Sequence, residues 1–188
     1  ANYYFENGKY SRASKWFDRV DENSLSKAEL EKFYFNNGYT YFQNKRYSEA
    51  KKYFNRITTS SEYGSQAKYY LGYIAYEGDN YDEANELFDE VKGEKRYAKE
   101  MSYYQADMNF KLGKFQEAIN LGKDQYDKSR ANEKSELSKI IGESYFNLEN
   151  YKEALPYLKN YRGQRGKWNN TDYYQLGYAY YKEGNYED

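Results

Sequence analysis

The sequence has no cysteine, no histidine and one proline, and its 29 basic and 30 acidic side chains leave a net charge of −1. Without cysteine the chain can form neither disulfides nor thiolate metal sites. Without histidine it lacks the commonest general base and metal ligand, which argues against an enzyme. The neutral balance gives no global field to attract nucleic acid or an anionic membrane. We therefore expect no cofactor, no metal and no nucleic-acid partner.

Long apolar runs are also missing. No segment approaches the roughly 20 apolar residues needed to span a bilayer, and no signal-peptide pattern opens the sequence. We therefore expect no membrane-spanning segment.

Aromatic residues, in contrast, are abundant. They make up 21% of the chain, and 28 of them are tyrosines. Charged residues reach 31% and the mean hydropathy is −1.28, values that a disordered chain would share, but a disordered chain carries far fewer aromatics. The chain should therefore fold. Tyrosine can bury its ring while its hydroxyl reaches water, which suits a thin structure.

A motif of one aromatic residue, two polar residues and an alanine recurs along the chain. Successive motif alanines are 37, 34, 34 and 36 residues apart. The five copies are Tyr10 to Ala13, Tyr47 to Ala50, Tyr81 to Ala84, Phe115 to Ala118 and Tyr151 to Ala154. A second small residue precedes four of the alanines, at Gly38, Gly72, Ala106 and Gly142, and Gly177 begins a sixth copy. This spacing predicts a repeat architecture.

Each repeat has the pattern of two amphipathic helices. Apolar residues recur at three- and four-residue spacing before and after a short turn that is rich in glycine and asparagine. A turn this short makes the two helices antiparallel, and glycine and asparagine tolerate the left-handed conformation that ends a helix. We expect the glycine of the first helix to face the alanine of the second, so that the two backbones approach closely. Ser26 and Glu29 have the spacing of a capping box.

In these features the sequence resembles the tetratricopeptide repeat family over its whole length. The family's motif, about 34 residues long, has small residues at positions eight and twenty, tyrosine at eleven and an aromatic at twenty-four. The matching residues are Gly72 and Gly177 at eight, Tyr4, Tyr41, Tyr145 and Tyr180 at eleven, and Phe17, Phe54 and Phe88 at twenty-four. The resemblance implies an all-α, right-handed α-solenoid of stacked antiparallel hairpins with about eleven helices.

We expect a single array over residues 1–188. Full repeats are predicted at about 31–64, 65–98, 99–132 and 135–168, with partial repeats at 1–23 and 170–188. No repeat has the family's closing proline. Repeat four has Ala106 in place of glycine and Gly122 where the aromatic belongs, so we expect looser packing and a weaker second helix around Leu121 and Gly122.

Both ends of the sequence divide a hairpin. We therefore expect the sequence to be a portion of a longer array. Residues Tyr173, Leu176 and Tyr180 should then be incompletely covered, and we expect these ends to associate end to end between copies.

The resemblance also implies a binding surface, because in the family the first helices line the concave side and positions five, nine, twelve and thirteen reach partners. Aromatic rings dominate binding hot spots, although helical aromatic stripes are more often core, so both roles stay open. Positions five and nine are expected to point away from the second helix. The predicted partner-binding residues are Phe35, Tyr39, Phe42, Tyr69, Tyr73, Tyr76, Tyr103, Asp107, Phe110, Lys139, Glu143, Tyr174, Tyr178 and Tyr181.

The function we predict is a non-catalytic scaffold that binds a peptide or protein partner in an aromatic-lined groove. The family's carboxylate clamp needs lysine at position five and asparagine at position nine, and no repeat here has that pair. A receptor for C-terminal peptides of that type is therefore disfavoured.

Two other classes of function stay open. Glycan-binding helical-repeat proteins similar to the starch-utilisation lipoproteins hold sugars on exposed aromatics, but they use long insertions and every connection here is short. A helical lytic transglycosylase would need a glutamate in a deep cleft, for which a thin solenoid has no evident place. The bias to tyrosine, asparagine and lysine resembles proteins of the Bacteroidetes group, and it favours the periplasm or cell envelope over the cytoplasm.

Overall fold

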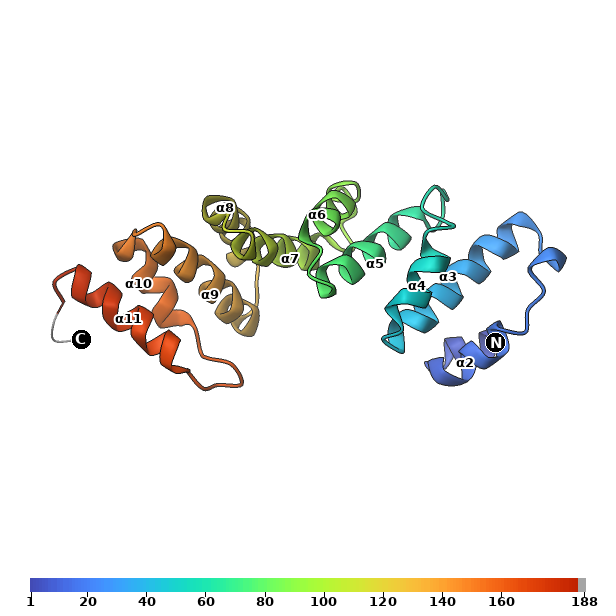
Figure 1. Cartoon of the computed structure of the whole chain (residues 1–188), viewed down its shortest axis with the longest axis horizontal. Coiled ribbons are helices and arrows are strands. Elements are labelled where there is room, and N and C mark those ends of the chain that lie inside the picture. Colours follow the sequence, from blue (N-terminus) through green and yellow to red (C-terminus); the bar gives the residue numbers. More distant parts are fainter. Residues whose placement is uncertain (186–188) are drawn as a thin grey trace. The chain divides into compact units, whose positions relative to one another are not determined.

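The structure is a computed structural model that describes residues 1–185, and the chain divides into two compact units that meet in sequence between Lys95 and Arg96. Unit 1 precedes this point and unit 2 follows it. Eleven α-helices and one 3-10 turn account for the regular structure of residues 1–185, apart from an isolated bridge between Gln164 and Lys167 (Figure 1). The predicted all-α architecture is confirmed. None of the described helices combines the length and apolar character needed to cross a membrane.

Unit 1 consists of three helical hairpins. Its elements are α1 (Asn2–Glu6), α2 (Tyr10–Phe17), the 3-10 turn η1 (Glu22–Ser24), α3 (Lys27–Gln43), α4 (Tyr47–Phe54), α5 (Gly64–Glu77) and α6 (Tyr81–Asp89). The helices pair in chain order, and Figure 1 shows α3 and α4 side by side. The motif aromatic is the first residue of each second helix, so the sequence motif marks where those helices begin.

Unit 2 repeats the same plan. Its elements are α7 (Ala98–Lys111), α8 (Phe115–Tyr126), α9 (Ala131–Asn147), α10 (Tyr151–Asn160) and α11 (Asn170–Lys182). Helix α7 pairs with α8 and α9 pairs with α10, while α11 contacts both α10 and α9.

The turns inside the hairpins contain the predicted left-handed residue, but glycine does not always supply it. Gly8 and Gly113 have φ values of +67° and +73°, and Gly184, which follows α11, has a φ of +75°. In the other three hairpins the left-handed residue is not a glycine, since Lys45, Asp79 and Glu149 have φ values of 57°, 59° and 61°. The short two-helix connection therefore fixes the backbone more strongly than the local residue type does.

The atoms nearest to two motif glycines belong to an aromatic ring of the paired helix, where we expected the motif alanine. A Cβ atom added to Gly38 would lie 2.9 Å from the Phe54 ring, and one added to Gly72 would lie 2.7 Å from the Phe88 ring. The motif alanines are fully buried. The glycine thus makes room for the large side chain one turn beyond the alanine, which brings the two helices together by a ring-into-groove contact.

The expectation of a weak helix around Leu121 and Gly122 is wrong. Helix α8 has 12 residues, against eight in α4 and nine in α6. A Cβ atom at Gly122 would lie 2.8 Å from Ile141 of α9, so the glycine allows α9 to approach α8 closely. The close contact with the next hairpin compensates for the low helix propensity of glycine.

Side-chain caps begin two of the first helices, α3 and α11. Ser26 and Glu29 form the predicted capping box of α3, with Ser26 N donating to Glu29 Oε2 over 2.9 Å. Asn169 caps α11 in the same way, because its side-chain oxygen accepts from Thr171 N and Asp172 N.

Candidate functional site

Most of the predicted partner-binding residues of unit 1 lie in one continuous set of ring contacts. We call this set the aromatic strip. It consists of Phe5, Tyr10, Phe35, Tyr39, Phe42, Tyr70, Tyr73 and Tyr76. All eight side chains are half-buried. They come from α1, α2, α3 and α5, so three successive hairpins contribute to a single surface.

Ring geometry holds the strip together. The Tyr39 centroid lies 5.6 Å from that of Tyr10 and 5.3 Å from that of Tyr70, both edge to face. The Phe42 centroid lies 4.9 Å from that of Tyr70 and 5.3 Å from that of Tyr73. Such contacts add about 0.5–1.5 kcal/mol each beyond the burial of apolar area. The rings are therefore held in fixed orientations before any partner binds.

Tyr70 is a central member of the strip that the sequence did not single out. Its ring contacts Phe35, Tyr39 and Phe42 of the preceding hairpin and stacks on Phe54 at 5.3 Å. Motif position six, which Tyr70 occupies, has no constant character in the other repeats. The equivalent residues are Asn36, Tyr104, Ile140 and Gln175. No repeat-wide pattern could therefore have identified it.

Tyr69 belongs to the core more than to the strip. Only 9% of it is exposed, and its ring lies 6.0 Å from that of Phe88. Phe35, at the same motif position, also contacts a second helix, because its ring lies 6.2 Å from that of Phe54. The expectation that position five points away from the second helix is wrong for both residues, since each ring is wide enough to reach the large residue of the paired helix.

Hydroxyl groups along and beside the strip stay protonated. Burial raises the pKa of Tyr10, and the neighbouring Tyr39 raises it further. Burial also raises the pKa of Tyr63, to about 12, with Glu62 and Glu31 adding to the effect. Neutral phenols can both donate and accept hydrogen bonds, so the strip has hydrogen-bonding groups beside its apolar ring faces.

In unit 2 six of the eight predicted residues fall into three groups. The first, which we call the polar cluster, consists of Lys139, Glu143, Tyr161 and Asp172. The ammonium of Lys139 lies 3.4 Å from Asp172 Oδ1 and 4.0 Å from Glu143 Oε1, and it sits 4.8 Å from the centre of the Tyr161 ring. Asp172 also accepts a hydrogen bond from Asn169 N, which ties the cluster to the start of α11.

Burial and charge act in opposite directions within the polar cluster. Burial raises the pKa of Glu143, and Asp172 raises it further while Lys139 lowers it. Burial lowers the pKa of Lys139, but Glu143 and Asp172 more than offset this, so the pKa of Lys139 is raised. Glu143 is only 8% exposed and Asp172 only 6%. The cluster therefore joins α9 to α11 and offers little charge to solvent.

The second group is aromatic. Tyr178 lies 5.7 Å from Tyr174, with the rings stacked, and 5.8 Å from Phe146, edge to face. Tyr174 and Tyr181 are each 62% exposed, far more than the half-buried rings of the strip.

Two predicted residues of α7, Asp107 and Phe110, lie outside the three groups. Asp107 forms an ion pair with Lys111 at 2.8 Å, and the Phe110 ring lies 5.8 Å from that of Phe115.

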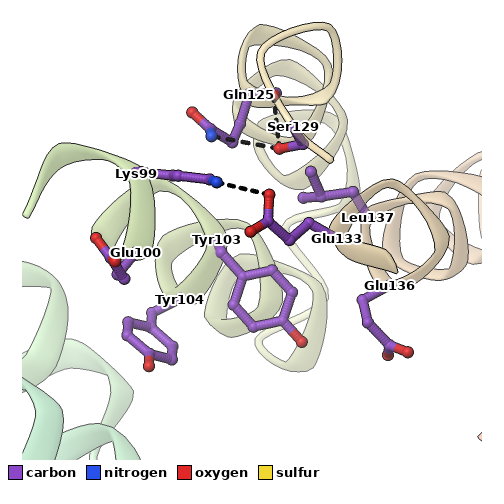
Figure 2. Close-up of a pocket in the computed structure, with 9 residues that line it drawn as sticks. All are labelled: Lys99, Glu100, Tyr103, Tyr104, Gln125, Ser129, Glu133, Glu136 and Leu137. Carbon is purple, nitrogen blue, oxygen red and sulfur yellow. Dashed lines mark hydrogen bonds and ion pairs between the residues drawn. The ribbon is translucent and has the colours of Figure 1, made fainter. Parts of the chain in front are cut away.

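The third group is a pocket between α7, α8 and α9, with Tyr103 at its centre (Figure 2). We call it the α7–α9 pocket. Its volume is about 230 Å³. It is lined by Lys99, Glu100, Tyr103, Tyr104, Gln125, Ser129, Glu133, Glu136 and Leu137. Tyr103 is the only one of these that the sequence predicted, because the others occupy motif positions outside the expected concave set.

The lining of this pocket is part apolar and part acidic. An ion pair of 2.6 Å joins Lys99 to Glu133. Gln125 and Ser129 hydrogen bond to each other, with the Gln125 amide donating to Ser129 Oγ over 3.3 Å. Burial raises the pKa of Tyr103 to about 12, and Asp107 and Glu136 add to the effect. Tyr103 is thus neutral and faces negative charge.

The chain is similar to known proteins in its repeat sequence and in its fold. The family model of the tetratricopeptide repeat matches residues 35–99. Among solved structures, a MamA mutant is similar with a TM-score of 0.71 and 19% identity, over 84% of this chain and 89% of that chain. MamA AMB-1 has a TM-score of 0.69 at 19% identity, and MamA MSR-1 has 0.67 at 18%. They cover 90% and 88% of their own chains and 84% of this one.

No curated protein matches the sequence. At identities this low, the likeness to MamA shows the fold alone. Residues 35–99 therefore match the tetratricopeptide repeat model, and most of the chain has a fold similar to that of MamA.

Proposed function

We propose that the chain is a non-catalytic scaffold that binds a peptide or protein partner on the aromatic strip of unit 1. The observation that carries the proposal is the strip itself, in which half-buried rings from three hairpins contact one another without interruption. Half-burial matters because each ring is partly accessible to a partner while its packing restrains it.

Rings that are already fixed lose little conformational entropy when a partner binds. Ordering a flexible side chain at an interface costs about 0.5–1.5 kcal/mol, and rings that are already locked avoid most of this cost. Aromatic residues are also enriched among the few positions that dominate binding energy. The match of residues 35–99 to the tetratricopeptide repeat supports the proposal, because such repeats are binding modules in the family that the sequence resembles.

The polar cluster supports the absence of catalysis. A general acid needs a raised pKa and access to a substrate. Glu143 has the raised pKa, but Lys139 and Asp172 surround it and it does not line the α7–α9 pocket. Its position is explained by the contact between α9 and α11.

The proposal can be tested with peptides selected from a random displayed library against the full chain. We expect Tyr73→Ala to weaken the binding of a selected peptide by about tenfold or more, as for a central ring of an interface. Trp16→Ala is the matched control, because Trp16 is a 48% exposed aromatic of α2 outside the strip. Selected peptides that bind Tyr73→Ala as tightly as the unchanged chain would contradict the proposal.

Glycan binding is the second candidate, favoured by the exposed rings of Tyr174 and Tyr181. Planar faces of this kind suit stacking on sugars. A glycan array probed with the full chain and with the double variant Tyr174→Ala, Tyr181→Ala separates the two candidates. Sugar binding that is lost in the double variant would favour the second candidate over the first.

The predicted end-to-end self-association stays a prediction. Tyr173 of α11 is 63% exposed, and within residues 1–185 a Cβ atom added to Gly177 would have no neighbour within 4 Å, so another helix could cover this surface. We expect light scattering to show a mass that rises with concentration, and Tyr173→Ser to suppress the rise. A constant monomer mass would overturn this prediction.

A further inference from the structure

We propose that the α7–α9 pocket receives the side chain of an arginine or lysine of the bound partner. This proposal rests on the proposed function, because it names the chemistry of one side chain that a protein or peptide partner presents to unit 2. Size, apolar lining and charge each lead to it.

The size of the pocket suits a single side chain better than a larger free ligand. Pockets that enclose free ligands have volumes of about 300–1,000 Å³, and this one has about 230 Å³. A ligand that depended on this pocket alone would be poorly enclosed. A side chain that projects from a larger partner needs no more room, because the remainder of the partner binds elsewhere.

The apolar lining suits a long aliphatic stem. Leu137 is 1% exposed and forms part of the wall, while the half-buried rings of Tyr103 and Tyr104 supply two aromatic surfaces. Arginine and lysine bury their methylene groups on such surfaces and keep the charged group near the rim. Their cations are also attracted to the faces of tyrosine rings.

The charges at the rim select a cation. Three glutamates and one lysine line the pocket. Lys99 is already paired with Glu133, and Glu133 also accepts a hydrogen bond from Arg130 N. Glu100 and Glu136 form no ion pair within residues 1–185. Two carboxylates are thus left without a cation, and an acidic side chain in the pocket would be repelled by both.

Figure 2 shows how these groups are arranged. The Tyr103 ring lies in the middle, with Glu136 on one side and Glu100 and Tyr104 on the other, and the Lys99–Glu133 ion pair crosses above it. Glu100 and Glu136 thus lie on opposite sides of the Tyr103 ring in this view. Proximity of Glu136 to this ring agrees with its effect on the pKa of Tyr103.

The test uses Nα-acetyl-arginine methylamide as the probe, added to the full chain labelled at its leucine methyl groups. We expect the Leu137 methyl resonances to shift saturably. The uncharged isostere Nα-acetyl-citrulline methylamide should bind more weakly by about fivefold, the effect of roughly 1 kcal/mol from two exposed carboxylates. Equal binding of the two probes, or no shift at Leu137, would overturn the proposal.

A pair of double variants tests the charges directly. Glu100→Gln with Glu136→Gln should reduce the affinity for the arginine probe by about fivefold and abolish the preference over citrulline. Glu117→Gln with Glu153→Gln removes the same charge from exposed first turns of α8 and α10 and should leave both unchanged. An unchanged preference in the first variant would contradict the proposal.

The two proposals fail in different ways. If the arginine probe does not bind while Tyr73→Ala still weakens selected peptides, the pocket assignment is wrong and the scaffold function stands. If the probe binds at Leu137 but Tyr73→Ala has no effect on peptides, the aromatic strip is not the partner surface and the pocket assignment stands.

Discussion

Units 1 and 2 use the same hairpin plan but fill it with different side chains. In unit 1 the space beside the motif glycine is occupied by the rings of Phe54 and Phe88, and in unit 2 the equivalent space beside Gly142 is occupied by Leu158. Fully buried aliphatic residues such as Ile119, Leu137 and Ile141 supply much of the second core. The backbone pattern therefore depends on small residues at fixed positions, and the identity of the large residues is free to vary.

The difference in filling changes the surface that each unit presents. In unit 1 the buried ring of Phe54 contacts Phe35 and Tyr70 of the strip, so the rings of the core and of the surface form one continuous network. Unit 2 has a more aliphatic core, and among its charged residues are a buried cluster and the acidic lining of the α7–α9 pocket. Unit 1 thus presents an aromatic surface, whereas unit 2 presents a pocket with several carboxylates.

The largest expected effect comes from removing a ring at the junction of core and strip. Phe54 is fully buried and contacts both Phe35 and Tyr70. Phe54→Ala should lower the free energy of unfolding by about 3–5 kcal/mol, because it leaves a large cavity. Hydrogen exchange should accelerate in α3 to α5 while α9 and α10 stay protected.

A matched change in unit 2 sharpens this comparison. Leu158→Ala removes fewer atoms from the equivalent place, so we expect a loss nearer to 2–3 kcal/mol, at the lower end of about 2–5 kcal/mol for such changes. The acceleration should be confined to α9 and α10. Equal acceleration in both units for either variant would show that they unfold together, and the distinction between them would be lost.

A smaller effect is expected from adding one methyl group to a motif glycine. Gly72→Ala places a Cβ atom 2.7 Å from the Phe88 ring and should cost about 1–3 kcal/mol through overpacking. In the described part of the chain no atom lies within 4 Å of such a Cβ at Gly177, so Gly177→Ala should stabilise α11 by up to about 1 kcal/mol through helix propensity. Thermal unfolding measures both. A destabilised Gly177→Ala would mean that something covers this face.

The smallest effect is a change in pH dependence in unit 2. Burial raises the pKa of Glu143 above its ordinary value of 4.5, so the folded state holds this proton more tightly than the unfolded state. The contribution of Glu143 to stability therefore falls as the pH rises above 4.5. Glu143→Gln should gain stability relative to the unchanged chain as the pH is raised through this window. A constant difference between the two proteins, measured by urea unfolding, would contradict the raised pKa.

The sequence predicted the helices well because each depends on local chemistry. The motif aromatics Tyr10, Tyr47, Tyr81, Phe115 and Tyr151 are the first residues of the second helices. Ser26 and Glu29 cap α3 as their spacing required. These features need only the near neighbours of each residue, so a single sequence contains them.

The details of the candidate site were harder to predict because they depend on contacts between hairpins. Tyr69 and Tyr70 are adjacent on α5, yet Tyr69 is mostly buried against Phe88 and Tyr70 joins the strip of the preceding hairpin. Gly122 was expected to weaken α8, but its contact with Ile141 of α9 gives it a packing role. The lining of the α7–α9 pocket comes from three helices, and no single repeat contains it.

The most direct test of the scaffold account maps a selected peptide onto the aromatic resonances of the full chain. Nuclear magnetic resonance of ring carbons and protons reports each tyrosine and phenylalanine separately. The account predicts that Tyr39, Phe42 and Tyr73 shift on binding while Trp16 does not. Shifts confined to Trp16 and the second helices, with the strip unaffected, would contradict it.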